Sequence, residues 1–168
     1  MAGHSGTARV THLRSTWTLQ ASPVEVWSVL ASAQEWSRWW PGLTSTVVKA
    51  GNPDGVGTAG DLTFASPLGY RLRLGLEVTS SSPPQEVGTR RVGDRIGTAH
   101  ARLLGYRDST IVIIDWRVHL NRPVLAQAER VVPRVMHWAH HEVMRAGERG
   151  LRAHLAAEGG RTEESTHR

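Results

Sequence analysis

The strongest constraint on the fold is the position of two helical patterns, which stand near opposite ends of the chain. The first covers residues 22–40 and the second residues 124–157. Between them apolar and polar side chains alternate, which is typical of half-buried strands. This order predicts an α+β protein in which a curved antiparallel sheet grips a long C-terminal helix. The space between such a sheet and its helix can hold a small, largely apolar molecule.

Turn and capping residues set the predicted boundaries of the first helices. Ser22 is an expected N-cap, Pro23 occupies the first helical position, and Glu25 completes a capping box. Ser32 can cap a second short helix, which Pro41 ends.

The closing segment repeats its apolar residues with a period of 3.6, and we expect a helix over residues 135–156. Pro133 lacks a backbone donor, so it should kink this segment or divide it into a short and a longer helix. Gly147 and Gly150 lie on the apolar side, where glycine lowers helix stability. Their presence predicts that the backbone of the sheet approaches the helix closely.

Seven strands are predicted, one before the first helices and six between them and the closing helix. They cover residues 10–20, 43–50, 62–65, 70–78, 86–92, 97–106 and 110–120. The stretch 51–60 is rich in turn-forming residues and has neither a Gly-Lys-Ser/Thr motif nor a following helix. It is therefore expected to be a loop rather than a phosphate site, and it could form a flexible flap over the cavity.

The composition indicates one domain of the ordinary globular class. We expect this domain over residues 9–157, with disordered tails at 1–8 and 158–168. Cysteine is absent and no apolar run is long enough to span a membrane, so we expect a cytoplasmic protein without stable membrane insertion. The net charge of +5 comes from scattered arginines, which predicts a solvated surface and no nucleic-acid partner. The oligomeric state stays open, a homo-oligomer included.

Four segments together resemble a known superfamily. They are WTLQASPVEVW at 17–27, WSRWWPG at 36–42, DWRV at 115–118 and MRAGERGL at 144–151. The chain resembles the START-like (SRPBCC, helix-grip) superfamily over nearly all of residues 10–157, and within it the bacterial polyketide cyclase/dehydrase and lipid-transport group. The resemblance implies a seven-stranded helix-grip fold around a ligand cavity. Its members include aromatase/cyclases and lipid-transfer, hormone-binding and coenzyme-Q-binding proteins, and no shared catalytic motif can be placed on this chain.

A histidine cluster in the closing helix carries the candidate chemistry. His137 and His141 are four residues apart, but a metal site needs a third ligand, so no metal and no cofactor are predicted. His140 falls on the side of the helix that faces the sheet. Three interpretations stay open: a core residue bonded to a carbonyl or a strand hydroxyl, a group that orients a ligand, or a general base. His140 is therefore the candidate catalytic residue.

The predicted cavity lies between the closing helix and the inward faces of the strands, with Trp40 near its entrance. Trp36, Trp39 and Trp40 form an aromatic patch on the second helix, which either anchors that helix or touches ligand. The residues predicted to bind ligand are Trp40, Tyr70, Leu72, Leu74, Ile114, Trp116, Met136, His140, Val143 and Met144.

Three functions are consistent with these patterns. The first is binding or transport of a hydrophobic or aromatic small molecule. The second is an enzyme, a polyketide aromatase/cyclase or dehydratase, which would act in the same cavity by folding a reactive substrate. The third is a protein-interaction module that uses the same groove.

Overall fold

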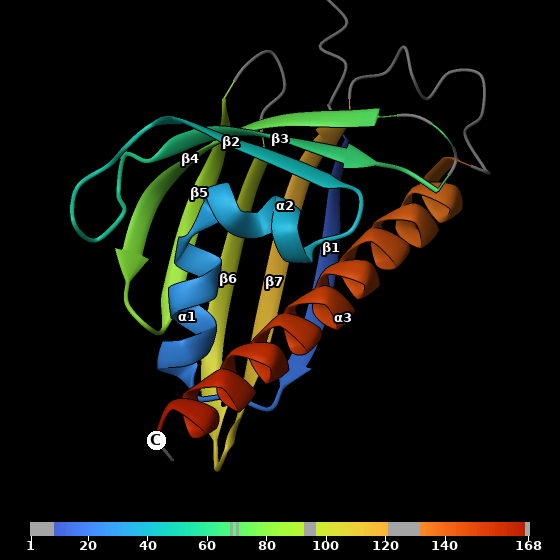
Figure 1. The fold of residues 1–168 in the computed structure, drawn as a ribbon. Coiled ribbons are helices and arrows are strands. Elements are labelled where there is room, and N and C mark those ends of the chain that lie inside the picture. Colours follow the sequence, from blue (N-terminus) through green and yellow to red (C-terminus); the bar gives the residue numbers. More distant parts are fainter. Residues whose placement is uncertain (1–8, 68, 70, 93–96, 121–131, 167–168) are drawn as a thin grey trace, which may run out of the picture.

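A seven-stranded antiparallel sheet curves around one long helix in the computed structural model, which describes residues 9–67, 69, 71–92, 97–120 and 132–166 (Figure 1). This arrangement confirms the predicted α+β helix-grip fold. The strands are β1 (Arg9–Leu19), β2 (Leu43–Lys49), β3 (Ala59–Ala65), β4 (Arg71–Ser82), β5 (Glu86–Val92), β6 (Gly97–Tyr106) and β7 (Ser109–Leu120). The helices are α1 (Pro23–Ala31), the 3-10 turn η1 (Ala33–Glu35), α2 (Trp36–Trp39) and α3 (Val132–Thr166).

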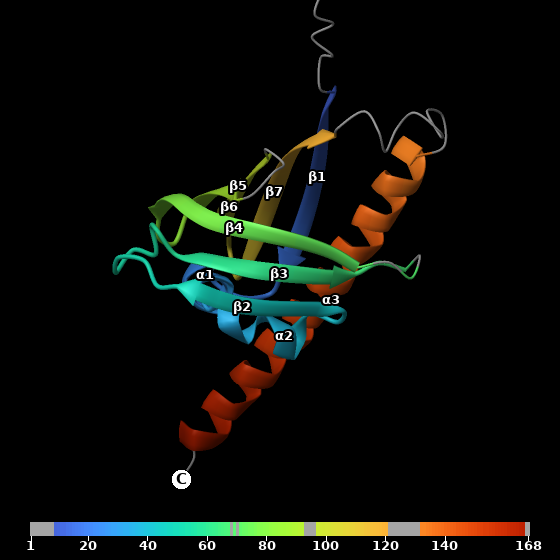
Figure 2. The same ribbon diagram turned by 90° about the horizontal axis from the view of Figure 1, so that it is seen from above.

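The first and last strands of the chain lie side by side at one edge of the sheet. The sheet runs β1-β7-β6-β5-β4-β3-β2, and every neighbouring pair is antiparallel. Figure 2 shows the sheet bending, so that β2, β3 and β4 lie across the direction of β1 and β7. The concave side of this bend holds α1 and α2, and α3 packs against β1 and α2.

Helix α1 begins as the sequence predicts. The Ser22 hydroxyl accepts a hydrogen bond from the Glu25 backbone, and the Glu25 carboxylate accepts one from the Ser22 N–H at 2.8 Å. The Ser22 hydroxyl also donates to the Glu25 carboxylate at 2.7 Å, and this bond, followed by the one from the Ser22 N–H, lowers the pKa of Glu25. The capping box thus fixes where the chain turns from β1 into α1.

Helix α3 differs from the prediction at its C-terminal end. It continues through Thr166, beyond residue 157 where the sequence predicts a tail. Pro133 lies in its first turn, where a missing backbone donor is tolerated. The predicted short helix before Pro133 falls on residues 124–131, which lie outside the described part of the chain.

Gly147 and Gly150 of α3 do face a close neighbour, but the neighbour is not the sheet. A Cβ atom on Gly147 would lie 2.5 Å from Cε2 of Trp40, and one on Gly150 would meet the backbone carbonyl of Trp39. The predicted contact with sheet backbone was therefore wrong. The neighbour is the C-terminal end of α2, where Trp39 is the last helical residue and Trp40 is the C-cap.

Candidate functional site

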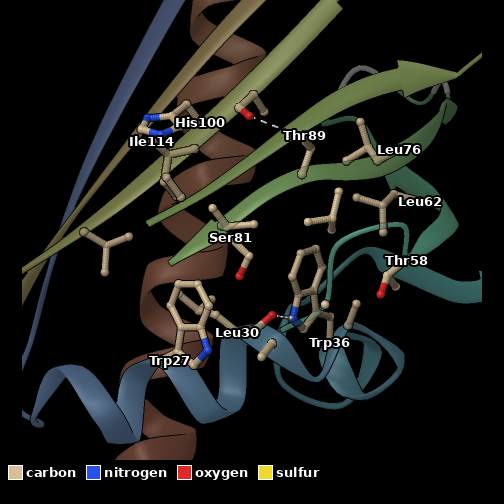
Figure 3. A pocket seen from close by; sticks show the side chains of 18 of the residues that line it. Trp27, Leu30, Trp36, Thr58, Leu62, Leu76, Ser81, Thr89, His100 and Ile114 are labelled. Carbon is tan, nitrogen blue, oxygen red and sulfur yellow. Dashed lines mark hydrogen bonds between the residues drawn. The ribbon is translucent and has the colours of Figure 1, made fainter. Parts of the chain in front are cut away.

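A cavity of about 190 Å³ lies on the concave side of the sheet, between the strands and the helices. Figure 3 shows α1 and the short helices on one side of it and the strands on the other. Its helical wall consists of Trp27, Leu30, Ala31, Ala33, Trp36, Trp40 and Met144. The strand wall includes Trp17, Leu62, Phe64, Leu76, Val78, Val87, Ala99, Ala101, Leu103, Val112, Ile114 and Trp116.

Strand register explains which side chains reach this cavity. Paired residues of an antiparallel sheet share a face. Ala99 pairs with Trp116, Ala101 with Ile114, and both pairs point into the cavity. The small alanines of β6 leave open space in the middle of the sheet, while the larger residues of β7 bound it.

Trp40 joins the cavity wall to the core. Its ring lies edge-on to Trp17 and Phe64, at centroid distances of 5.3 and 5.6 Å, and stacks on Trp39 at 5.5 Å. Its indole N–H donates to the backbone carbonyl of Val143 at 3.1 Å. The aromatic patch of α2 therefore has both of the expected positions. It anchors the helix to the core, and two of its rings, Trp36 and Trp40, also border the cavity.

The polar side chains around the cavity differ in whether they already form hydrogen bonds within the protein. The Thr89 hydroxyl donates to the carbonyl of Ala99, and the Thr58 hydroxyl accepts from the N–H of Gly51. The hydroxyl of Ser81 forms no hydrogen bond with any described residue. The ionisable residues among the described lining are Asp54 and His100.

The loop between β2 and β3 borders the cavity through Asp54, Gly55 and Thr58. Its backbone is held internally, with bonds from Asn52 to Val56 and from Gly55 to Asn52, and two bonds join Gly57 and Thr58 to Val78 of β4. Asn52 also accepts from the Val56 N–H through its side chain. The sequence suggested a flexible flap, whereas the structure shows a hydrogen-bonded cap.

His140 lies between α3 and the β1–β7 pair, next to the cavity rather than on its lining. Its Nε2 is 3.3 Å from the hydroxyl of Ser15, and its ring lies edge-on to Trp116 at 6.5 Å. Burial, followed by the nearby charges of His137 and His141, lowers the pKa of His140 to about 4. The imidazole is therefore neutral at physiological pH and hydrogen-bonded within the protein.

The structure brings together four of the ten predicted ligand-binding residues at the cavity: Trp40, Ile114, Trp116 and Met144. Leu74 and Val143 pack against the core cluster instead, and His140 bonds to Ser15. Tyr70 and the side chain of Met136 lie outside the described part of the chain.

Leu72 is placed differently from the prediction, since its side chain is 42% exposed. It pairs with Phe64 and so has the expected facing. However, the cavity borders β4 only from Leu76 onward, and Leu72 stands at the opposite end of that strand. Alternation predicts the face of a strand but not how far the covering helices extend along it.

Sequence reasoning missed most of the wall formed by α1 and by strands β4 to β6. The alternation of Ala99, Ala101 and Leu103 was a usable signal for β6. Trp27 and Leu30 are three residues apart and so share the apolar face of α1, but nothing local shows that this face meets a cavity. Ser81 had no signal, because the sequence does not show the register shift in β4 that turns it inward.

The described residues contain neither a candidate membrane span nor a candidate metal site. None of their helices is long and apolar enough to cross a membrane. They hold no group of three or more metal-binding side chains in a suitable arrangement.

Comparison with known proteins relates the whole domain to one family. A family model described as polyketide cyclase / dehydrase and lipid transport matches residues 10–156. A search of curated protein sequences finds no significant match. Among solved structures, a START superfamily protein from Mycobacterium smegmatis is 16% identical, with a TM-score of 0.68 and coverage of 87% of this chain and 97% of that one.

Two further similar structures bear the names of aromatase/cyclases. The Zhui aromatase/cyclase of a Streptomyces species is 12% identical, with a TM-score of 0.71 and coverage of 88% of this chain and 94% of that one. The di-domain protein StfQ from the steffimycin biosynthetic pathway is 12% identical, with a TM-score of 0.72 and coverage of 90% and 52%. At such identities these structures show a shared fold.

Proposed function

The chain belongs to the polyketide cyclase/dehydrase and lipid transport family, and from that premise we propose that it binds a hydrophobic, aromatic small molecule in the cavity described above. The observation that carries the proposal is the lining, in which tryptophan, leucine, isoleucine, valine and alanine predominate. Each CH₂ group that a ligand buries there contributes about 0.8 kcal/mol. The flat rings of Trp27, Trp36 and Trp116 favour a planar ligand, since aromatic pairs gain about 0.5 to 1.5 kcal/mol beyond area burial.

The volume of the cavity limits the size of that molecule. An apolar protein cavity of about 150 Å³ is known to bind benzene. The cavity here, about 190 Å³, is somewhat larger. We propose that a molecule of one or two fused rings enters without rearrangement, and that a longer ligand requires lining side chains to move.

Filling the cavity tests this proposal directly. Ala101 lies in the middle of the strand wall, and Ala101→Leu places three further carbon atoms in the space the ligand would occupy. We expect a neutral, environment-sensitive naphthylamine dye to bind the wild-type protein and to lose at least tenfold in affinity for this variant. Thr98→Leu is the control, because Thr98 lies on the exposed face of the same strand. Failure of the folded wild-type protein to bind any such dye would refute the proposal.

Ring closure of a polyketide-like chain is the second candidate, and it is supported by the family description and by the aromatase/cyclases among the similar structures. A cavity that holds a reactive chain in a folded shape accelerates cyclisation by proximity alone. His140 is the candidate base, and in its present position it bonds to Ser15. Incubation with a poly-β-ketone thioester tests this function, and cyclic products at the rate of the uncatalysed reaction would count against it.

A further inference from the structure

Strand β4 contains a bulge next to the cavity. Val78 pairs with Thr89 and Ser80 pairs with Gly88, so that β4 uses one more residue than β5 over this step. The extra residue is Thr79. Bulges of this kind often stand beside ligand sites, where they change the direction of a side chain.

The bulge determines which side chain faces the cavity. Before it, Leu76 and Val78 point inward at alternate positions. Continued alternation would turn Ser80 inward and Ser81 outward. Instead Ser81 pairs with Val87, and both border the cavity. Figure 3 shows the Ser81 hydroxyl directed from β4 toward the side of the cavity that α1 forms.

Neighbouring residues hold the bulge in place. Gly88 is buried, and a Cβ atom there would lie 2.5 Å from the hydroxyl oxygen of Ser80. Ser80 therefore occupies the space that a side chain at position 88 would fill. The hydroxyl of Thr79 donates to the carbonyl of Gly88 at 3.3 Å. The inward direction of Ser81 is thus built into the packing of β4 on β5.

Among the hydroxyl groups that border the cavity, that of Ser81 is best placed to meet a ligand. The hydroxyl of Thr89 is already bonded to Ala99. The indole N–H groups of Trp17 and Trp116 have no acceptor among the described residues, but protein atoms cover both of them. The Ser81 hydroxyl bonds to no described residue and is not covered in this way, so it can both donate to and accept from a molecule in the cavity.

We infer that the ligand carries a hydroxyl or carbonyl oxygen at the end that lies against α1, and that Ser81 selects and orients it by a hydrogen bond to that oxygen. The inference rests on the proposed function, since it assigns a direction to a molecule held in the same cavity. The rest of the ligand then lies along the apolar strands toward Ile114 and Trp116.

A pair of matched ligands separates this role from general binding. Naphthalene and naphthol differ by one hydroxyl group, and their affinities are measured by displacement of the naphthylamine dye. We expect Ser81→Ala to weaken naphthol binding by roughly threefold to tenfold, the range of a single hydrogen bond, and to leave naphthalene binding unchanged. Ser82→Ala is the control, because Ser82 is exposed on the same strand. Thermal unfolding of each variant verifies that it is folded.

Each outcome decides between the two proposals. If neither ligand displaces dye from the wild-type protein, the proposed function fails and the role of Ser81 fails with it. If both ligands bind but Ser81→Ala weakens them equally, or weakens neither, cavity binding stands and the inference about Ser81 is overturned. Equal effects of Ser81→Ala and Ser82→Ala on naphthol would overturn it as well.

Discussion

The ring of Trp40 lies against the backbone of α3 at Gly147 so closely that a Cβ atom at this position would come within 2.5 Å of ring atom Cε2. The same ring donates its N–H to Val143, one turn earlier in the helix. Because Trp40 also borders the cavity, this contact fixes one wall of the candidate site to the long helix.

We therefore expect Gly147→Ala to destabilise the protein, although alanine is the better helix former. The helix itself would gain about 1 kcal/mol, while overpacking in a buried contact costs typically 1 to 3 kcal/mol. A net loss of about 1 kcal/mol in the free energy of unfolding, measured by urea denaturation, is the expected result. Gly159→Ala is the control, since no atom lies within 4 Å of its added Cβ, and it should stabilise the helix. Stabilisation by both substitutions would contradict the Trp40 contact.

A second anchor joins β7 to the start of α1. The side chain of Thr110 is fully buried, and its hydroxyl donates to the carbonyl of Ala21 at 2.7 Å. Thr110→Val keeps the shape but leaves that carbonyl without a partner, so we expect a loss of about 1 to 3 kcal/mol in unfolding free energy. Thr98→Val, on an exposed strand position, should change stability by less than about 0.5 kcal/mol. Equal effects in urea denaturation would show that the Thr110 bond is unimportant.

The cap formed by the β2–β3 loop should be sensitive at Gly51. A Cβ atom there would meet the carbonyl of Val56 and lie 2.5 Å from the N–H nitrogen of Thr58. Gly51→Ala must therefore shift the loop that borders the cavity. We expect weaker binding of the naphthylamine dye, by threefold or more, with a small loss of thermal stability. Unchanged dye affinity in a folded variant would show that the cap is not part of the binding site.

Local patterns predicted those parts of the fold that depend on neighbouring residues. The capping box at Ser22 is contained within four positions, and alternation identified the inward face of β7. The direction of Ser81 could not be predicted, because one extra residue in β4 reverses the alternation and only its pairing with β5 reveals this. The partner of Gly147 was misassigned for a similar reason, since glycines show that something comes close but not which element it is.

A structural role of His140 can be distinguished from a role in ligand binding, because its buried imidazole makes the stability of the protein depend on pH. The pKa of His140 is lowered from 6.5 to about 4, chiefly by burial and further by His137 and His141. A histidine with a lowered pKa contributes stability that is complete above the unfolded-state value and is lost as the pH falls from 6.5 toward 4. Between pH 7 and pH 5 this loss is about 2 kcal/mol.

We expect wild-type protein to lose this stability in urea denaturation at pH 5, and His140→Met to lose about 2 kcal/mol less over the same change of pH. His12→Gln is the control, since His12 is exposed on β1, and it should retain the wild-type pH dependence. His140→Met should also bind the naphthylamine dye with nearly unchanged affinity, because His140 bonds to Ser15 and does not line the cavity. A variant that keeps the wild-type pH dependence but loses dye affinity would reverse this assignment and return His140 to the ligand site.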